Sequence, residues 1–217
     1  IQTIGAGIYA QNTGGAGQGD ITVLQNGTVT VTGTNTFDDG IFANTNGEGD
    51  VFVKNTGTIT AQTGDGIDAS ITGPGFVFSD GNLTVDNTKI VTSALGYGIT
   101  ATSNSNDDVL VTNSGAVSGK IDGIRALSSG IGGSVTVKQT AGSTVQTGLD
   151  TNAGIRAEIT NAGNSDLVWV NLAGGTVTAN GDGVFAQNAG TGDVKVDVAG
   201  AVTASSEEHT SELQSQF

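Results

Sequence analysis

The sequence of 217 residues contains no cysteine and no methionine, and only one proline and one histidine. Without cysteine the chain can form no disulfide, no thiolate metal site and no cysteine nucleophile. No apolar run approaches the roughly 18 residues of a membrane-spanning helix, so we expect no membrane insertion. Basic residues are scarce, since seven Lys and Arg stand against 21 Asp and Glu, for a net charge of −14. Such a chain repels the phosphate backbone, and we expect no nucleic-acid partner.

Glycine is abundant instead, with 36 residues, which indicates many tight turns. A motif of Gly, a branched aliphatic residue, any residue and Ala recurs seven times. The six intervals between Gly7 and Gly183 average about 29 residues, a period typical of solenoid proteins. The motifs begin at Gly7, Gly40, Gly66, Gly98, Gly123, Gly154 and Gly183.

Two further segments follow each motif, and in both of them β-branched residues recur with a period of two. This alternation indicates β-strands. The middle segment of each repeat has a pair of apolar positions that we expect to face inward, and the last segment has one central aliphatic residue. The inward pairs are Ile21 and Val23, Val51 and Val53, Leu83 and Val85, Val109 and Val111, Val135 and Val137, Leu167 and Trp169, and Val194 and Val196. Because Trp169 stands in a column otherwise rich in valine, we expect that its coil either bulges or has its register shifted by one residue. The central residues are Val29, Ile59, Val91, Val117, Val145, Val177 and Val202.

Three short strands per repeat, with no helical periodicity, predict an all-β fold in which each repeat is one coil of a single-stranded parallel β-helix. Connections between parallel strands are almost always right-handed, so we expect a right-handed solenoid of about seven coils. The repeats cover residues 1–204. Residues 205–217 differ from them, and the stretch 206–215 resembles the translation of a common sequencing adapter. We therefore predict a non-native or disordered tail, which contains the only histidine, His209.

The position two residues after the inward pair carries an amide side chain in the first six repeats, and in the last repeat Asp197 lies one residue after the pair. Amides stacked at the spacing of parallel strands can bond to one another and to buried turn groups. The sequence therefore predicts a structural amide ladder along the solenoid. The column reads Gln25, Asn55, Asn87, Asn113, Gln139, Asn171 and Asp197, and the ladder is assigned to Asn55, Asn87, Asn113, Gln139 and Asn171.

Aspartates recur just before the motifs and just before the middle segments. Calcium takes six to eight oxygen ligands, so Asp65, Asp122 and Asp182 are candidate calcium ligands. Aspartate beside glycine is also selected by tight turns, and we prefer that interpretation. We therefore predict no metal and no cofactor.

The aspartate pairs at 38–39 and 107–108 are the only candidates for glycoside hydrolysis, which needs two carboxyl groups. β-Helical enzymes that cleave polysaccharides combine such acids with a histidine or with clustered basic residues, and neither accompanies these pairs. Arg125 and Arg156 share one repeat position, where we expect exposed residues that pair across coils and, as an alternative, a ligand groove. We predict no catalytic residue and no enzyme.

The longest linker of the repeats contains the only proline, Pro74, and two phenylalanines, Phe76 and Phe78. These two side chains either cover the core or form an exposed apolar patch. The loop is therefore a possible interaction loop, and covering of the core is the preferred interpretation.

The repeat reads Gly-Asp-Gly-Ile-x-Ala followed by Gly-x-Gly-Asp-Val-x-Val-x-Asn-x-Gly-x-Val-Thr, and it resembles the passenger regions of bacterial autotransporters, the type V secreted proteins. The resemblance covers residues 1 to about 204. It implies a β-helical passenger at the bacterial cell surface or outside the cell, acting as an adhesin or structural stalk, with a possible part in virulence. It also implies a C-terminal β-barrel translocator in the full-length chain and a surface ligand, either a host or bacterial protein or a glycan. The alternative is a β-helical module that binds or degrades polysaccharide.

Overall fold

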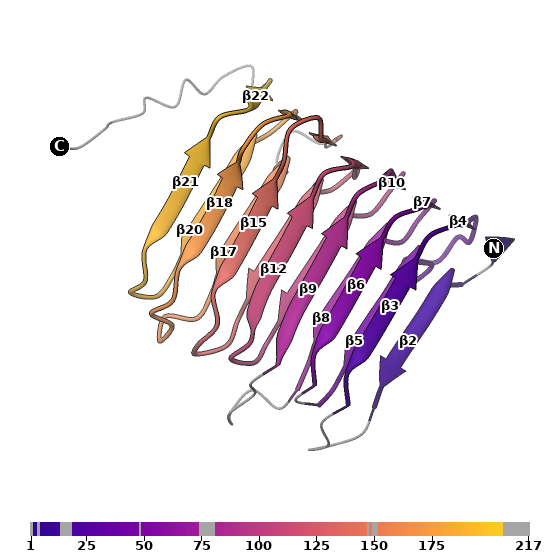
Figure 1. Ribbon diagram of the computed structural model, residues 1–217, viewed down its shortest axis with the longest axis horizontal. Helices are drawn as coiled ribbons and strands as arrows, with labels where there is room; N and C mark the ends of the chain where they lie inside the picture. Colours follow the sequence, from indigo (N-terminus) through magenta and orange to yellow (C-terminus); the bar gives the residue numbers. More distant parts are fainter. Residues whose placement is uncertain are drawn as a thin grey trace.

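The computed structural model of the chain describes residues 2–3, 5–13, 19–47, 49–73, 81–146, 148 and 152–205. Within these ranges the secondary structure is entirely β. The strands form three parallel sheets that wind as a right-handed β-helix through about six turns between the first motif strand and the last (Figure 1). The predicted fold class is confirmed. No helix long and apolar enough to cross a membrane occurs among the described residues.

Each coil contributes one strand to each sheet. The motif sheet contains β2 (Ile8–Asn12), β5 (Ile41–Thr45), β8 (Ile67–Ile71), β11 (Ile99–Ser103), β14 (Ile124–Ser128), β17 (Ile155–Ile159) and β20 (Val184–Asn188). The middle sheet contains β3 (Ile21–Gln25), β6 (Val51–Asn55), β9 (Asn82–Asn87), β12 (Asp108–Asn113), β15 (Val135–Gln139), β18 (Val168–Leu172) and β21 (Val194–Val198). The third sheet contains β1 (Gln2–Thr3), β4 (Thr28–Val31), β7 (Thr58–Ala61), β10 (Val91–Ser93), β13 (Ala116–Ser118), β16 (Thr144–Gln146), β19 (Thr176–Ala179) and β22 (Ala201–Ala204).

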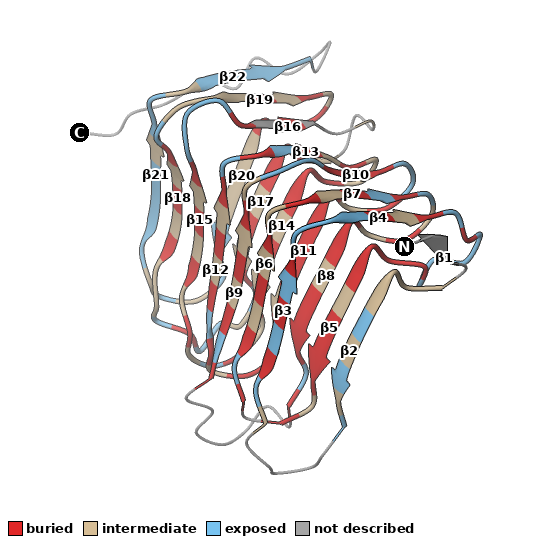
Figure 2. Cartoon of the chain, turned by 45° about the vertical axis from the view of Figure 1, so that its right-hand side comes forward, coloured by how far each residue is buried: buried red, intermediate tan, exposed pale blue. Residues whose placement is uncertain are grey.

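The core consists of aliphatic columns that run along the axis of the solenoid. In the motif sheet the isoleucines and alanines of successive motifs pair in register, as in Ile67 with Ile99 and Ala69 with Ala101. These side chains are fully buried in the central coils, whereas the last coil leaves residues such as Val196 about 44% exposed (Figure 2). An inward position is therefore fully buried only where its coil has a neighbouring coil on both sides.

The motif glycines mark the points where successive coils approach most closely. A Cβ at Gly66 would lie 2.5 Å from the carbonyl oxygen of Gly98 in the next coil, and closer still to a methyl group of Val91. Neither group can retreat, because one is backbone and the other belongs to the packed core. Glycine is therefore required here by space.

The sixth coil differs by one residue from the predicted inward pattern. Val168 and Val170 pair with Val135 and Val137, while Trp169 faces outward opposite Thr136. The inward assignment of Leu167 and Trp169 is therefore wrong, and the alternative expectation of a register shifted by one residue at this coil is confirmed. An indole cannot occupy a close-packed column of valines, and a shift of one residue moves a whole strand to the other face.

The same shift removes Asn171 from the predicted amide ladder. Asn171 pairs with Lys138 on the outer face, and Leu172 takes the inward position beside Gln139. The assignment of Asn171 to the ladder is thus corrected. Asp197 also faces outward, because it pairs with Asn171.

The remaining amides form a buried column. The side-chain nitrogen of Asn55 donates to the oxygen of Asn87 at 2.7 Å, and the nitrogen of Asn87 donates to Asn113 at 2.8 Å. Gln139 occupies the next position and donates to the backbone carbonyl of Thr176 at 3.3 Å. Its buried Oε1 accepts no hydrogen bond, since the side-chain nitrogen of the preceding Asn113 donates to the backbone carbonyl of Gly115 at 3.0 Å.

Candidate functional site

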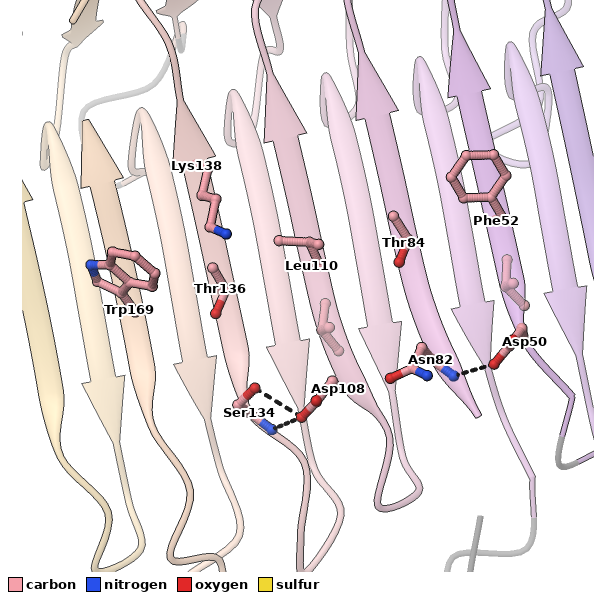
Figure 3. Close-up of a pocket in the computed structure, with 12 residues that line it drawn as sticks. Asp50, Phe52, Asn82, Thr84, Asp108, Leu110, Ser134, Thr136, Lys138 and Trp169 are labelled. Carbon is pink, nitrogen blue, oxygen red and sulfur yellow. Dashed lines mark hydrogen bonds between the residues drawn. The ribbon is translucent and has the colours of Figure 1, made fainter. Parts of the chain in front are cut away.

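A groove of about 560 Å³ crosses the outer face of the middle sheet from β6 to β18 (Figure 3). Its side chains belong to five successive coils, so residues far apart in sequence form one surface. The lining residues are Asp50, Val51, Phe52, Asn82, Thr84, Asp108, Val109, Leu110, Ser134, Thr136, Lys138 and Trp169.

The floor of the groove is a single column of outward residues in register. Phe52, Thr84, Leu110, Thr136 and Trp169 occupy equivalent positions on neighbouring strands. All five are half-buried. Large apolar residues alternate with threonines along this column, and Phe52 and Trp169 stand at its two ends (Figure 3).

A row of polar residues borders one side of this floor, just before or at the start of the strands. The amide of Asn82 donates to Asp50 Oδ1 at 2.7 Å, and the amide and hydroxyl of Ser134 donate to Asp108 Oδ1 at 2.7 and 2.8 Å. No described residue donates to the Oδ2 atom of either aspartate. Each carboxylate therefore connects two coils through one oxygen, and its other oxygen is an unused acceptor on an exposed residue that lines the groove.

Trp169 forms the end of the groove, and two lysines from the flanking strands, Lys138 and Lys195, lie beside its indole ring. The ammonium groups of Lys138 and Lys195 lie 5.3 and 5.0 Å from the indole centroid. The indole N–H donates to Asp197 Oδ2 at 2.8 Å, and Lys195 also pairs with this carboxylate at 2.8 Å. The hydrogen bond from Lys195, followed by that from Trp169, lowers the pKa of Asp197 below its ordinary value. Lys138 forms no ion pair with any described residue.

A second chemically distinct region lies at the motif sheet, where three aspartates approach one another. Burial raises the pKa of Asp39 to about 6 and that of Asp68 to about 7, and the charge of Asp65 contributes to both shifts. The Asp39 carboxylate accepts the amide of Asp65 at 2.7 Å, which partly opposes its shift. Sequence reasoning had not foreseen the raised pKa values of Asp39 and Asp68, because the burial of these side chains depends on the neighbouring coils.

The candidate calcium ligands lie before the motif strands. Asp65 accepts the amide of Tyr97 at 2.9 Å, and Asp122 bonds to the Arg156 guanidinium at 3.0 Å. Asp182 is exposed. Among the described residues no group of three or more His, Cys, Asp or Glu side chains is arranged to hold a metal ion. Asp65 and Asp122 therefore connect neighbouring coils, Asp65 through the backbone amide of Tyr97 and Asp122 through the side chain of Arg156.

The two arginines of the motif sheet lie side by side, since Arg125 pairs with Arg156. Each guanidinium also lies over an aromatic ring, at 5.4 Å from the Tyr97 centroid for Arg125 and at 4.6 Å from the Phe185 centroid for Arg156. Both side chains are half-buried. Arg156 also pairs with Asp122 at 3.0 Å and with Glu158 at 3.5 Å, and neither arginine lines the groove.

Sequence reasoning missed most of the groove, because it sought inward positions and treated the outward ones as solvent-facing. The alternation of large apolar residues and threonines becomes visible only when outward positions are aligned between repeats. Phe76 and Phe78 of the predicted interaction loop lie outside the described residues. No protein-family model, curated protein or solved structure matches the chain.

Proposed function

We propose that this chain is a β-helical passenger of the autotransporter type, displayed at the bacterial cell surface or secreted, and that it acts as an adhesin. The groove on the middle sheet is the observation that carries this proposal. A structural stalk needs only a packed interior and a polar exterior. This chain instead exposes apolar side chains in a lined groove, as binding sites do.

The repeat architecture supports a role in presenting such a surface. Each coil adds one strand to the sheet, so the outer face can extend a binding site without altering the core. The resemblance of the repeat to autotransporter passengers supports the same proposal, together with a surface or extracellular location and a C-terminal translocator in the full-length chain.

Binding accounts for the groove better than catalysis. Asp50 and Asp108 each use one carboxylate oxygen to hold a backbone amide of the following coil. Two strand steps separate them, and no described residue of the groove supplies a second acid beside either one. The lining therefore offers hydrogen-bond acceptors and apolar contacts without an acid–base pair.

Adhesion of coated beads tests the proposal. Beads carrying the full chain should attach to bacterial or epithelial cell surfaces, and the variant with both Phe52→Thr and Trp169→Thr should lose attachment. Threonine already occupies this column in neighbouring coils, so the fold should tolerate it. The control is Leu24→Ala, which removes an outward apolar side chain, 69% exposed, outside the groove. Attachment that is absent in the wild-type chain, or unchanged in the double variant, would contradict the adhesin assignment.

A further inference from the structure

We infer that the groove binds a linear, neutral glycan whose pyranose rings are joined equatorially, as in cellulose, xylan or chitin. This inference rests on the proposed function, because it names the ligand class of the same groove. Four features of the lining carry it: the spacing of its apolar residues, its exposed acceptors, its lack of free backbone groups and its charge.

The apolar residues of the floor repeat at every second strand. Phe52, Leu110 and Trp169 are separated by the in-register residues Thr84 and Thr136. Since adjacent strands lie about 4.8 Å apart, the apolar positions recur about every 10 Å along the axis. In an extended, equatorially linked glycan every second ring presents the same face, and the length of two rings is close to this spacing. The three apolar residues therefore match alternate rings of one straight chain.

An extended peptide fits this floor poorly. Its side chains on one face recur about every 7 Å, which does not match the spacing of the apolar residues. Peptides that bind sheets also pair with a free strand edge, whereas the groove lies on the face of a sheet whose strands between β6 and β18 are all paired on both sides. A peptide backbone would thus leave its amides without backbone partners.

The polar border of the groove suits hydroxyl groups. The Oδ2 atoms of Asp50 and Asp108 are open acceptors two strands apart, which is the same interval as that of the apolar residues. The ammonium of Lys138 lines the groove beside Trp169 and supplies donors at that end. Sugar rings present apolar C–H faces and hydroxyl edges, so one chain can use both the floor and the border.

The charge of the groove favours neutral sugars over acidic ones. Asp50 and Asp108 line its border, against the single groove cation Lys138 among the described lining residues. The chain as a whole carries a net charge of −14. A polyanion would be repelled by this surface, whereas hydroxyl groups would not.

Calorimetric titration of the full chain tests the inference with defined oligosaccharides. Cellopentaose, xylopentaose or chitopentaose should bind, while maltopentaose, which is curved by its axial linkages, and pentagalacturonate, which is acidic, should bind at least tenfold more weakly. Phe52→Thr and Trp169→Thr should each weaken binding about tenfold, the loss expected when an anchoring aromatic side chain is removed. Leu24→Ala should bind as the wild type does, and thermal melting of each variant verifies that it is folded.

Several outcomes would overturn the glycan assignment. These are no binding of any of the three straight oligosaccharides, binding of maltopentaose or pentagalacturonate at equal affinity, and full affinity in the folded groove variants. If the double variant loses bead attachment to cells while no oligosaccharide binds, the adhesin proposal stands and the glycan assignment falls. If oligosaccharides bind through the groove while the beads do not attach to cells, the glycan assignment stands and the adhesin proposal falls.

Discussion

The two faces of the middle sheet consist of the same strands and follow different rules. Inward positions are filled by a uniform column that includes Val53, Val85 and Val111, all fully buried. The adjacent outward positions vary from Phe52 to Thr84 to Leu110. Close packing between coils restricts the inward residues, whereas the outward residues are restricted only by strand formation and by what they contact. In this protein the inner face determines the fold, and the outer face can vary without altering the packed core.

The largest expected effect comes from a charge placed in the inner columns. Ile67→Asp puts a carboxylate into a fully buried position and should reduce the free energy of unfolding by several kcal/mol. Urea denaturation followed by circular dichroism measures the change. The control is Thr60→Asp, an exposed position on β7, which should change stability by less than about 0.5 kcal/mol. Equal stability of the two variants would refute the inward assignment of Ile67.

Loss of a ladder amide should have the next largest effect. Asn87→Leu leaves the buried amide of Asn55 without its acceptor and should cost about 2 to 3 kcal/mol in urea denaturation. The matched control is Asn171→Leu, because Asn171 is half-buried on the outer face and lies outside the ladder. That variant should differ from the wild type by about 0.5 kcal/mol or less. Comparable losses of stability in the two variants would contradict the exclusion of Asn171 from the ladder.

The buried aspartates should make stability depend on pH. The pKa of Asp68 is raised from its ordinary value of 3.8 to about 7 in the folded chain. The folded state therefore binds the proton of this carboxyl group more tightly than the unfolded state does. The contribution of Asp68 to stability therefore falls as pH rises from about 4 to about 7, and stays constant above that. Asp68→Asn should raise the melting temperature at pH 8 and leave it nearly unchanged at pH 4. Equal shifts at both values would show that Asp68 is not perturbed.

The smallest effect on stability should come from the groove. Phe52→Thr changes a half-buried outward side chain to the residue that the neighbouring strand already carries, so unfolding should change by about 1 kcal/mol or less. The same change should weaken ligand binding about tenfold. Thermal melting and binding titration of one preparation measure both quantities. A loss of stability as large as that of Ile67→Asp would remove the distinction between the two faces.

Much of the fold was predictable because burial between coils imposes one pattern on every repeat. The inward residues of the motif strands, such as Ile67 and Ile99, were identified from spacing alone and pair as expected. In the sixth coil the size of Trp169 indicated either a bulge or a shift of one residue, because Leu167 and Trp169 also fit an alternating apolar pattern. Only the valine column of the neighbouring coil selects Val168 and Val170 instead.

The candidate groove was less predictable, because it arises from stacking and not from any local motif. Phe52 and Trp169 are more than 100 residues apart in the sequence, and their shared column depends on the register of every strand between them. The raised pKa of Asp68 likewise depends on its burial and on carboxylates from other coils. Both properties depend on the register between strands of successive coils. The alternation of inward residues in the sequence predicts that register only where the loops do not shift it.

The most direct test of the central claim uses Trp169, the only tryptophan of the chain, as a reporter inside the groove. Its fluorescence should change saturably when at least one of cellopentaose, xylopentaose and chitopentaose is added, and it should not respond to maltopentaose. The double variant Phe52→Thr and Leu110→Thr retains this reporter and should need a much higher oligosaccharide concentration. Fluorescence that stays constant while calorimetry detects binding would place the ligand elsewhere and contradict the assignment of the outer face of the middle sheet as the binding surface.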